Sequence, residues 1–219
     1  MFHQKTFIFN PFAENTYILY QDSGEAVIID PGCSNAAEES MLAGFISDKK
    51  LKPIRLLLTH AHLDHILGNA FIFRRYGLAP FMHRSDLDLL HSLVAICEMY
   101  GIGGISPSPE PAGYLNDGDL INIGEIELKA IYLPGHSAGS LCYYSNTEKC
   151  LWGGDVLFNQ SIGRTDLPGG HSETLIKGIK TKLFTLPDDV TVYSGHGIPT
   201  TIGFEKKNNP FVGEQVLGV

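Results

Sequence analysis

Short apolar runs of strand length alternate with segments of helical spacing along most of the chain. Runs of aliphatic, β-branched and aromatic residues bounded by turn residues predict β-strands. Residues 22–25 carry turn chemistry, so the first three of these strands are expected to be antiparallel neighbours. The predicted strands span residues 6–9, 16–20, 26–30, 54–59, 125–129, 141–144, 151–153 and 190–194.

Helices are predicted between these strands. Asn35 followed by Glu38 is typical of a helix N-cap with its reciprocal partner, and Ser85 followed by Asp88 repeats that spacing. Ser172 is the expected cap of a later helix. The three helices carry apolar residues at helical spacing: Met41, Leu42, Phe45 and Ile46; Leu87, Leu90, Val94 and Cys97; Leu175, Ile179 and Leu183.

Glycine and proline mark the ends of helices and one long connection. Gly77 and Gly101 are expected to end two helices. Residues 101–111 hold so many glycines and prolines that they predict a loop, which is either a simple connector or a flap over a substrate groove. The layered mixture of strands and helices predicts an α/β (α+β) fold.

Metal-capable side chains crowd the junction between one predicted strand and the segment that follows it. His60, His62, Asp64 and His65 come directly after the apolar run 54–59. Neutral imidazole and carboxylate are ligands that zinc, iron and manganese accept, and catalytic sites leave one coordination position to water. Alternation in an extended loop aims His60 and His62 at one ion, while Asp64 and His65 reach a second at the turn into the helix. This segment therefore predicts parts of two metal sites.

Three further candidate ligands each follow a short apolar run: His136, Asp155 and His196. Neighbouring glycines fit a backbone that bends sharply close to an ion. A histidine in such a place is usually an ordinary residue when taken alone, but the cluster at 60–65 favours a shared site. If Asp155 bridges, the two ions lie about 3.5–4 Å apart. The other histidines lack comparable partners and are assigned no role: His3, His83, His91 and His171.

Composition narrows the class of protein. The 219 residues are 43% hydrophobic and show no linker-like shift in composition, so one compact domain over residues 1–219 is expected. A net charge of −8 gives no attraction to phosphate backbones, and nucleic acid is not an expected partner. No signal pattern or membrane-spanning run is evident, which predicts a soluble, cytoplasmic protein without membrane contact. The cysteines form no Cys-x-x-Cys pair and are expected to be reduced: Cys33, Cys97, Cys142 and Cys150.

Together these motifs resemble the metallo-β-lactamase-fold hydrolase superfamily, and within it the short glyoxalase II-like (hydroxyacylglutathione hydrolase-like) branch. The resemblance covers most of the chain and includes residues 15–19, 28–32, 59–65, 134–140, 154–158, 163–166 and 194–197. It implies a four-layer αββα sandwich. It also implies that His60, His62 and His136 hold the first metal, that Asp64, His65 and His196 hold the second, and that Asp155 bridges them.

This ligand set predicts a hydrolase with two divalent metal ions, with zinc expected and iron or manganese as alternatives. Two ions lower the pKa of a shared water towards neutrality, so a metal-bridged hydroxide is the expected nucleophile. Asp64 is expected to act chiefly as a ligand, with water orientation as a second role. A small acyl thioester or related ester is the expected substrate, because a thiol of pKa about 8.5 departs as thiolate without a strong acid.

Two further residues each carry two interpretations. Asp30 either accepts a hydrogen bond from a metal-binding imidazole or forms a turn before Pro31. Arg164 either grips a substrate carboxylate or pairs with Asp166. The resemblance favours a role for Arg164 near the substrate.

The chain departs from the family in one respect, and two hypotheses other than hydrolysis stay open. Long glyoxalase II enzymes add a C-terminal region with basic glutathione-binding residues, whereas only 200–219 follow His196 here, with Lys206 and Lys207 as their cations. Another thioester or a small ester is therefore an alternative to hydroxyacylglutathione. A persulfide dioxygenase would bind one iron through the counterparts of His60, His136 and Asp155. A non-catalytic metal-binding protein is the third hypothesis.

Overall fold

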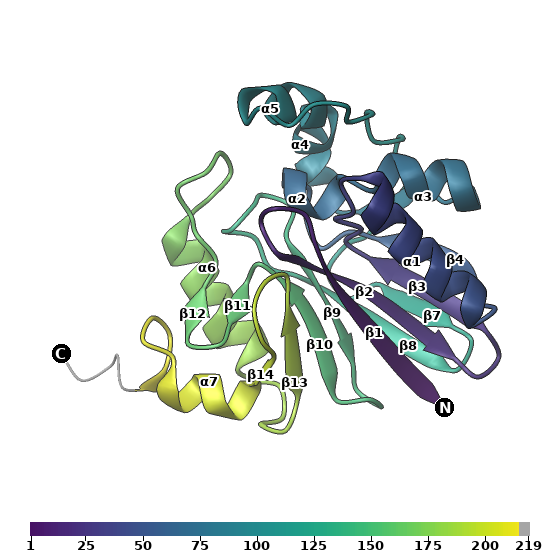
Figure 1. The fold of residues 1–219 in the computed structure, drawn as a ribbon. Helices are drawn as coiled ribbons and strands as arrows, with labels where there is room; N and C mark the ends of the chain where they lie inside the picture. Colours follow the sequence, from purple (N-terminus) through teal and green to yellow (C-terminus); the bar gives the residue numbers. More distant parts are fainter. Residues whose placement is uncertain (215–219) are drawn as a thin grey trace.

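Two six-stranded β-sheets form the centre of the molecule (Figure 1). The structure is a computed structural model and describes residues 1–214, so the last five residues of the predicted domain lie outside it. In the first sheet β1, β2 and β3 are antiparallel neighbours, as predicted, and β4, β5 and β6 extend it in parallel. Its strands are β1 (Phe2–Phe9), β2 (Glu14–Gln21), β3 (Glu25–Ile29), β4 (Lys52–Leu57), β5 (Pro80–Met82) and β6 (Gly113–Tyr114).

The second sheet has the order β14-β13-β10-β9-β8-β7. Strands β8 and β10 are both antiparallel to β9, and β13 is parallel to β10. The C-terminal ends of β8, β10 and β13 therefore meet at one edge of the sheet. Its strands are β7 (Leu120–Ile123), β8 (Ile126–Tyr132), β9 (Leu141–Ser145), β10 (Cys150–Gly154), β13 (Thr191–Ser194) and β14 (Thr200–Thr201); a separate ribbon pairs β11 (Leu157–Phe158) with β12 (Ser161–Ile162).

Helices cover the outer faces of both sheets (Figure 1). Those on the first sheet and along its edge are α1 (Ala36–Asp48), α2 (Leu63–Ile66), α3 (Asn69–Tyr76), the 3₁₀ turn η1 (Arg84–Asp86), α4 (Leu87–His91) and α5 (Leu93–Met99). Those beside the second sheet are α6 (Ser172–Gly178), the π-helical turn η2 (Ile179–Leu183) and α7 (Ile202–Asn208). The resulting order of layers is helix, sheet, sheet, helix, which confirms the predicted αββα sandwich.

The largest buried side chains lie between the two sheets. Trp152 and Tyr143 are fully buried there, in one cluster with Leu128 of the same sheet and Leu57 of the facing sheet. Each outer face has its own core, formed against α1 and α3 on one side and against α6, η2 and α7 on the other. The alternating burial of β8 over residues 126–129 confirms the predicted half-buried strand.

The helix caps differ in part from the prediction. The Asn35 side chain caps α1 as expected, but the Glu38 carboxylate accepts hydrogen bonds from the Asn10 and Ser34 backbone N–H groups instead of closing a reciprocal box. The predicted caps Ser85 and Ser172 are wrong, because the caps are the neighbouring imidazoles of His83 and His171. Both histidines therefore have structural roles that the sequence did not indicate.

Two further features concern the helices. The single helix predicted over 87–97 is split at Ser92, whose hydroxyl bonds the Asp88 carbonyl oxygen. Gly77 and Gly101 follow α3 and α5 with φ values of +71° and +72°, as expected for residues that end helices.

None of the helices within residues 1–214 has both the length and the apolar content needed to cross a bilayer.

Candidate metal centre

The seven candidate ligands come together at one edge of the sandwich. The loop after β4 carries His60 and His62, and α2 begins immediately afterwards with Asp64 and His65 in it. The other three follow the strands whose C-terminal ends share an edge: His136 after β8, Asp155 after β10 and His196 after β13. Residues more than a hundred positions apart in the chain thus reach one place because two sheets deliver them.

Hydrogen bonds join the two sheets beside this edge. The Tyr143 hydroxyl donates to the Leu58 carbonyl oxygen at 2.6 Å, and the Leu141 N–H donates to the Thr59 carbonyl oxygen at 2.7 Å. Both acceptors directly precede His60. The loop that carries the first histidines is therefore fixed to the second sheet as well as the first.

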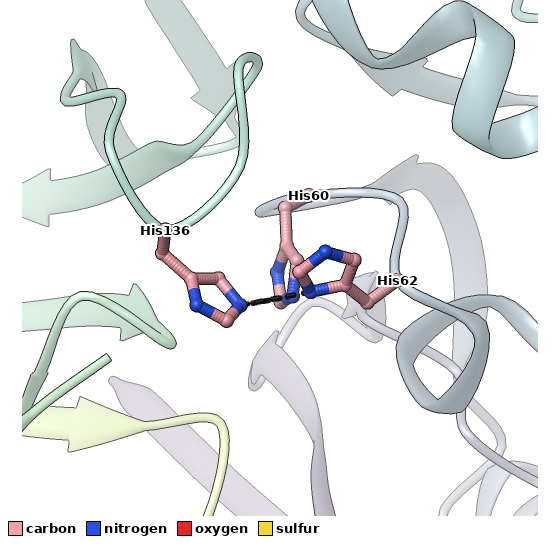
Figure 2. A group of neighbouring side chains, drawn as sticks. All are labelled: His60, His62 and His136. Atoms are coloured by element: carbon pink, nitrogen blue, oxygen red, sulfur yellow. Dashed lines mark hydrogen bonds between the residues drawn. The ribbon is translucent and has the colours of Figure 1, made fainter. Parts of the chain in front are cut away.

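The first group consists of His60, His62 and His136 (Figure 2). His136 Nε2 lies 2.9 Å from His62 Nδ1 and 3.2 Å from His60 Nε2. The other ring nitrogen of His136, Nδ1, donates to the Arg164 carbonyl oxygen at 2.8 Å, so Nε2 of the neutral ring carries a lone pair. Lone pairs directed at one another repel, whereas a cation between them would bind all three nitrogens.

The second group consists of Asp64, His65 and His196. His196 Nε2 lies 3.1 Å from Asp64 Oδ2, and His65 Nε2 lies 3.5 Å from the same oxygen. His196 Nδ1 donates to the Phe12 carbonyl oxygen at 3.0 Å, which again leaves Nε2 as the atom facing the group. The turn between β1 and β2 thus orients the last histidine of the sequence motif.

Asp155 lies between the two groups. One carboxylate oxygen is 3.4 Å from His65 Nε2, and the other is 3.6 Å from His136 Nε2 and 3.5 Å from His196 Nε2. Among the described residues, three buried polar atoms here have no hydrogen-bond partner: Asp155 Oδ1, His65 Nε2 and His62 Nε2. Unpaired buried polar atoms are costly, and ions held between the groups would satisfy the first two. The His and Asp clusters are consistent with a dinuclear metal site.

Burial and neighbouring charges set the protonation of these groups. Burial holds the pKa of His60 well below its usual value, and burial together with the nearby His136 lowers the pKa of His62 to about 4. Burial alone would lower the pKa of His65 and raise that of Asp155. Their mutual attraction, with Asp64 also acting on His65, instead raises the pKa of His65 and lowers that of Asp155. His60 and His62 are therefore neutral at pH 7, which suits metal binding.

Asp30 orients the imidazole of His65. Its buried carboxylate accepts hydrogen bonds from His65 Nδ1 at 3.1 Å, from the Thr59 N–H at 2.7 Å and from the Thr59 hydroxyl at 2.5 Å. Thr59 Oγ1 in turn lies 3.0 Å from His60 Nδ1. Asp30, His60 and His65 also lie close enough to form a third metal-sized group. Of the two roles predicted for Asp30, its hydrogen bond from His65 favours orientation of the imidazole over formation of a turn.

Asp86 is a positioning residue that the sequence did not reveal. Its side chain is fully buried and accepts hydrogen bonds from the Ala61 N–H at 3.1 Å, the Ser137 hydroxyl at 2.8 Å and the Gly139 N–H at 2.6 Å. One carboxylate therefore links the loop of His60 and His62 to the loop of His136. Nothing in its local sequence, the start of a predicted helix, indicates this tertiary contact.

Close packing at Gly195 and hydrogen bonds from Asn15 fix the loop that carries His196. A Cβ atom added to Gly195 would lie 2.1 Å from Asp155 Oδ1 and 2.6 Å from His65 Cε1, so only glycine fits there. The Asn15 amide donates to the carbonyl oxygens of Ser194 and Gly197, both at 3.0 Å. The His196 loop is thus held against β2, in the segment 15–19 that the resemblance singled out.

A cleft of about 990 Å³ opens onto both groups. Arg164 lines it, but its guanidinium forms a two-pronged ion pair with Asp166, with both N–O distances at 2.7 Å. This is the second of its two predicted contacts, and it raises the pKa of Arg164 while lowering that of Asp166 to about 2. Five of the candidate ligands line the cleft: His62, Asp64, His136, Asp155 and His196.

The segment 101–111 is a loop, as predicted, but it does not serve as a flap in this structure. The described residues that line the cleft include none of its members, and Ile102 and Ile105 pack instead against the core around α2, α4 and α5. The wall on this side is formed by Ile96 and Met99 of α5 and by Tyr100. The four cysteines are buried, free and outside all the His and Asp groups.

The fold and these converging side chains define a class of protein, the αββα sandwich with a candidate two-metal site at the sheet edge. The model of the Metallo-beta-lactamase superfamily matches residues 9–196, and the chain belongs to this superfamily. It is 38% identical over 206 residues to a Bacillus subtilis protein named probable metallo-hydrolase YqgX, covering 92% of this chain and 93% of that one. It is 35% identical over 202 residues to hydroxyacylglutathione hydrolase GloC of Haemophilus influenzae, covering 92% and 93%.

Solved structures agree with this assignment. BLEG-1, described as a B3 metallo-beta-lactamase, is 37% identical and superimposes with a TM-score of 0.87, covering 97% of this chain and 99% of that chain. TTHA1623, solved in a di-iron-bound form, is 33% identical with a TM-score of 0.84, covering 94% and 99%. One similar structure thus carries a pair of metal ions.

Proposed function

We propose that this protein is a binuclear metallohydrolase that cleaves small acyl thioesters or related esters. The observation that carries the proposal is the position of Asp155, whose two oxygens face His65 on one side and His136 and His196 on the other. His60, His62 and His136 would hold one ion, and Asp64, His65 and His196 the other. The names of YqgX and GloC support hydrolysis, and the di-iron form of TTHA1623 supports a two-metal site.

The chain supplies ligands, orientation and a binding surface. Two bound divalent ions supply an acidified water and polarise a carbonyl group. Asp64 and Asp155 both line the cleft, so either carboxylate can accept a hydrogen bond from the attacking water. We assign this orienting role to Asp64. The carbonyl oxygens of Phe12 and Arg164 and the carboxylate of Asp30 keep the imidazoles in the tautomer that ligation requires.

The leaving group follows from the residues that line the cleft. Apart from the candidate ligands, the titratable side chains among them are Tyr100 and Arg164. Arg164 keeps its proton at any pH a protein tolerates, and it is already paired with Asp166. An amide nitrogen needs a proton in order to leave, whereas a thiolate does not. A thioester therefore needs no proton donor at this site, whereas an amide would depend on Tyr100, and the thioester is the better fit.

The test measures thiol release and metal content on the same samples. Protein loaded with zinc, and separately with iron, is expected to contain two ions per chain and to release thiol from small acyl thioesters. H62A should lose most of this activity, whereas H91A should retain it, because His91 lies on the exposed side of α4 and pairs with Glu110. Oxygen uptake with a thiol persulfide and one iron per chain would instead identify a dioxygenase.

A further inference from the structure

Large apolar side chains remain exposed on one wall of the cleft. Met99 is 84% exposed and Tyr100 57% exposed, and the cleft is also lined by Phe12, whose ring contacts Tyr100, and by Ile198 at 68% exposure. Apolar surface gathered at a cleft commonly marks a ligand-binding face. None of these side chains is needed to fill the core, so their common position favours the binding of an apolar ligand in the cleft.

Helix α5 produces this wall by its spacing. Leu93 and Cys97 point into the core shared with α2 and α4, whereas Ile96 and Met99 line the cleft. Leu93 and Cys97 are four positions apart and Ile96 and Met99 three, so each pair forms a neighbouring pair on the helix surface, and the same two turns supply both a core side and a cleft side. The wall therefore stands on a helix that is anchored from behind.

The apolar wall is continuous with the candidate metal centre. The Phe12 carbonyl oxygen accepts the hydrogen bond from His196 Nδ1, while the Phe12 ring meets the Tyr100 ring edge to face at 6.3 Å. One residue thus contacts a candidate ligand through its backbone and the wall through its side chain. A substrate with its carbonyl at the metals would place an adjoining arm against Phe12 and Tyr100.

The cleft offers little for an anionic substrate arm. Among the described residues that line it, Arg164 is the cation, and Asp166 already neutralises its guanidinium. The two lysines near the C-terminus do not line the cleft, and Lys206 is bound to Asp188 and to the Leu186 carbonyl oxygen. The carboxylates of a glutathione moiety would therefore find no free positive partner there.

We propose that the substrates of this site are thioesters or esters that carry an uncharged, apolar arm, alkyl or aryl, lying against Phe12, Ile96, Met99 and Tyr100. This inference rests on the proposed hydrolase function and adds the substrate class. The arm belongs to either the acyl group or the thiol, and the same wall would bind it in both cases. Glutathione thioesters are then inferior substrates.

The first experiment compares kcat/KM across two series on metal-loaded protein. One series varies the acyl chain from acetyl to hexanoyl on N-acetylcysteamine, and the other varies the thiol from ethanethiol to hexanethiol on an acetyl group. Apolar burial predicts a rise of about two- to fourfold per methylene in at least one series. S-lactoylglutathione should fall below the best member of that series. In M99S and Y100S the ratio of longest to shortest substrate should drop, whereas M41S, an exposed methionine on α1, should leave it unchanged.

The second experiment measures binding without catalysis. Thioether analogues, in which a methylene replaces the carbonyl, are titrated calorimetrically into metal-free protein. Affinity should rise with chain length in the wild type and in M41S and rise less in M99S. Flat profiles in both series, or a preference for S-lactoylglutathione, would overturn the apolar-arm inference while leaving the hydrolase intact. Failure of every thioester and ester with two ions bound would overturn the hydrolase itself, and the inference with it.

Discussion

Replacement of Asp86 tests whether one buried carboxylate holds the two histidine loops together. In D86A the Ala61 N–H, the Ser137 hydroxyl and the Gly139 N–H all lose their acceptor in a fully buried place. Each unsatisfied donor costs about 1–3 kcal/mol, and the serine hydroxyl can turn to another partner. The two backbone N–H groups that remain unpaired therefore predict a loss of about 2–6 kcal/mol in the free energy of unfolding. For a chain of this length that corresponds to about 4–24 °C in Tm.

The same substitution should weaken the first metal site. The His60 and His62 loop and the His136 loop each lose a fixed contact to the other, and removal of a group that orients ligands typically lowers metal affinity about 10- to 100-fold. Chelator competition with zinc measures this directly. D86N should lie between D86A and the wild type, because the amide keeps one acceptor oxygen but turns its NH₂ towards a donor.

Asp88 provides the matched control, since it is an exposed carboxylate two positions along. D88N should change stability by no more than about 0.5 kcal/mol and leave zinc affinity unchanged. The reasoning is refuted if D86A unfolds within about 1 kcal/mol of the wild type in urea, or if its zinc affinity equals that of D88N.

Three further predictions address the centre itself. G195A should lower zinc stoichiometry, because its Cβ would lie 2.1 Å from Asp155 Oδ1, whereas G44A, in open space on α1, should bind zinc normally and gain up to about 1 kcal/mol in stability. D30N should weaken zinc binding about 10- to 100-fold through the lost acceptor for His65, and wild-type affinity would remove its orienting role. In metal-free protein the His62 ring should stay neutral at pH 6 and titrate near pH 4 by NMR, because burial disfavours its charged form; a midpoint near 6.5 would contradict that.

Much of the fold could be predicted because its signals are local. Each of the eight predicted strands is present, since apolar runs bounded by turn residues are typical of buried strands. The strands that were missed, among them β5, β6, β7 and β14, are only two to four residues long and depend on their neighbours in the sheet. The split at Ser92 was also missed, because a side chain that bonds a backbone carbonyl leaves the apolar spacing unchanged.

The candidate site was predictable to the extent that its chemistry is concentrated in sequence. The sequence alone singles out the cluster at 60–65 and the glycine-flanked His136, Asp155 and His196. The structure brings all of them together. Asp86, in contrast, acts only through contacts with loops 25 and more than 50 residues away, so no local pattern reveals it. The apolar cleft wall was likewise hidden, because Met99 and Tyr100 have the composition of an ordinary helix end.

The most direct measurement of the central claim is anomalous diffraction from crystals of zinc-loaded protein. The account predicts two zinc peaks per chain, about 3.5–4 Å apart. One should lie among His60, His62 and His136, the other among Asp64, His65 and His196, with an Asp155 oxygen at each. A single ion, or ions bound away from Asp155, would contradict it.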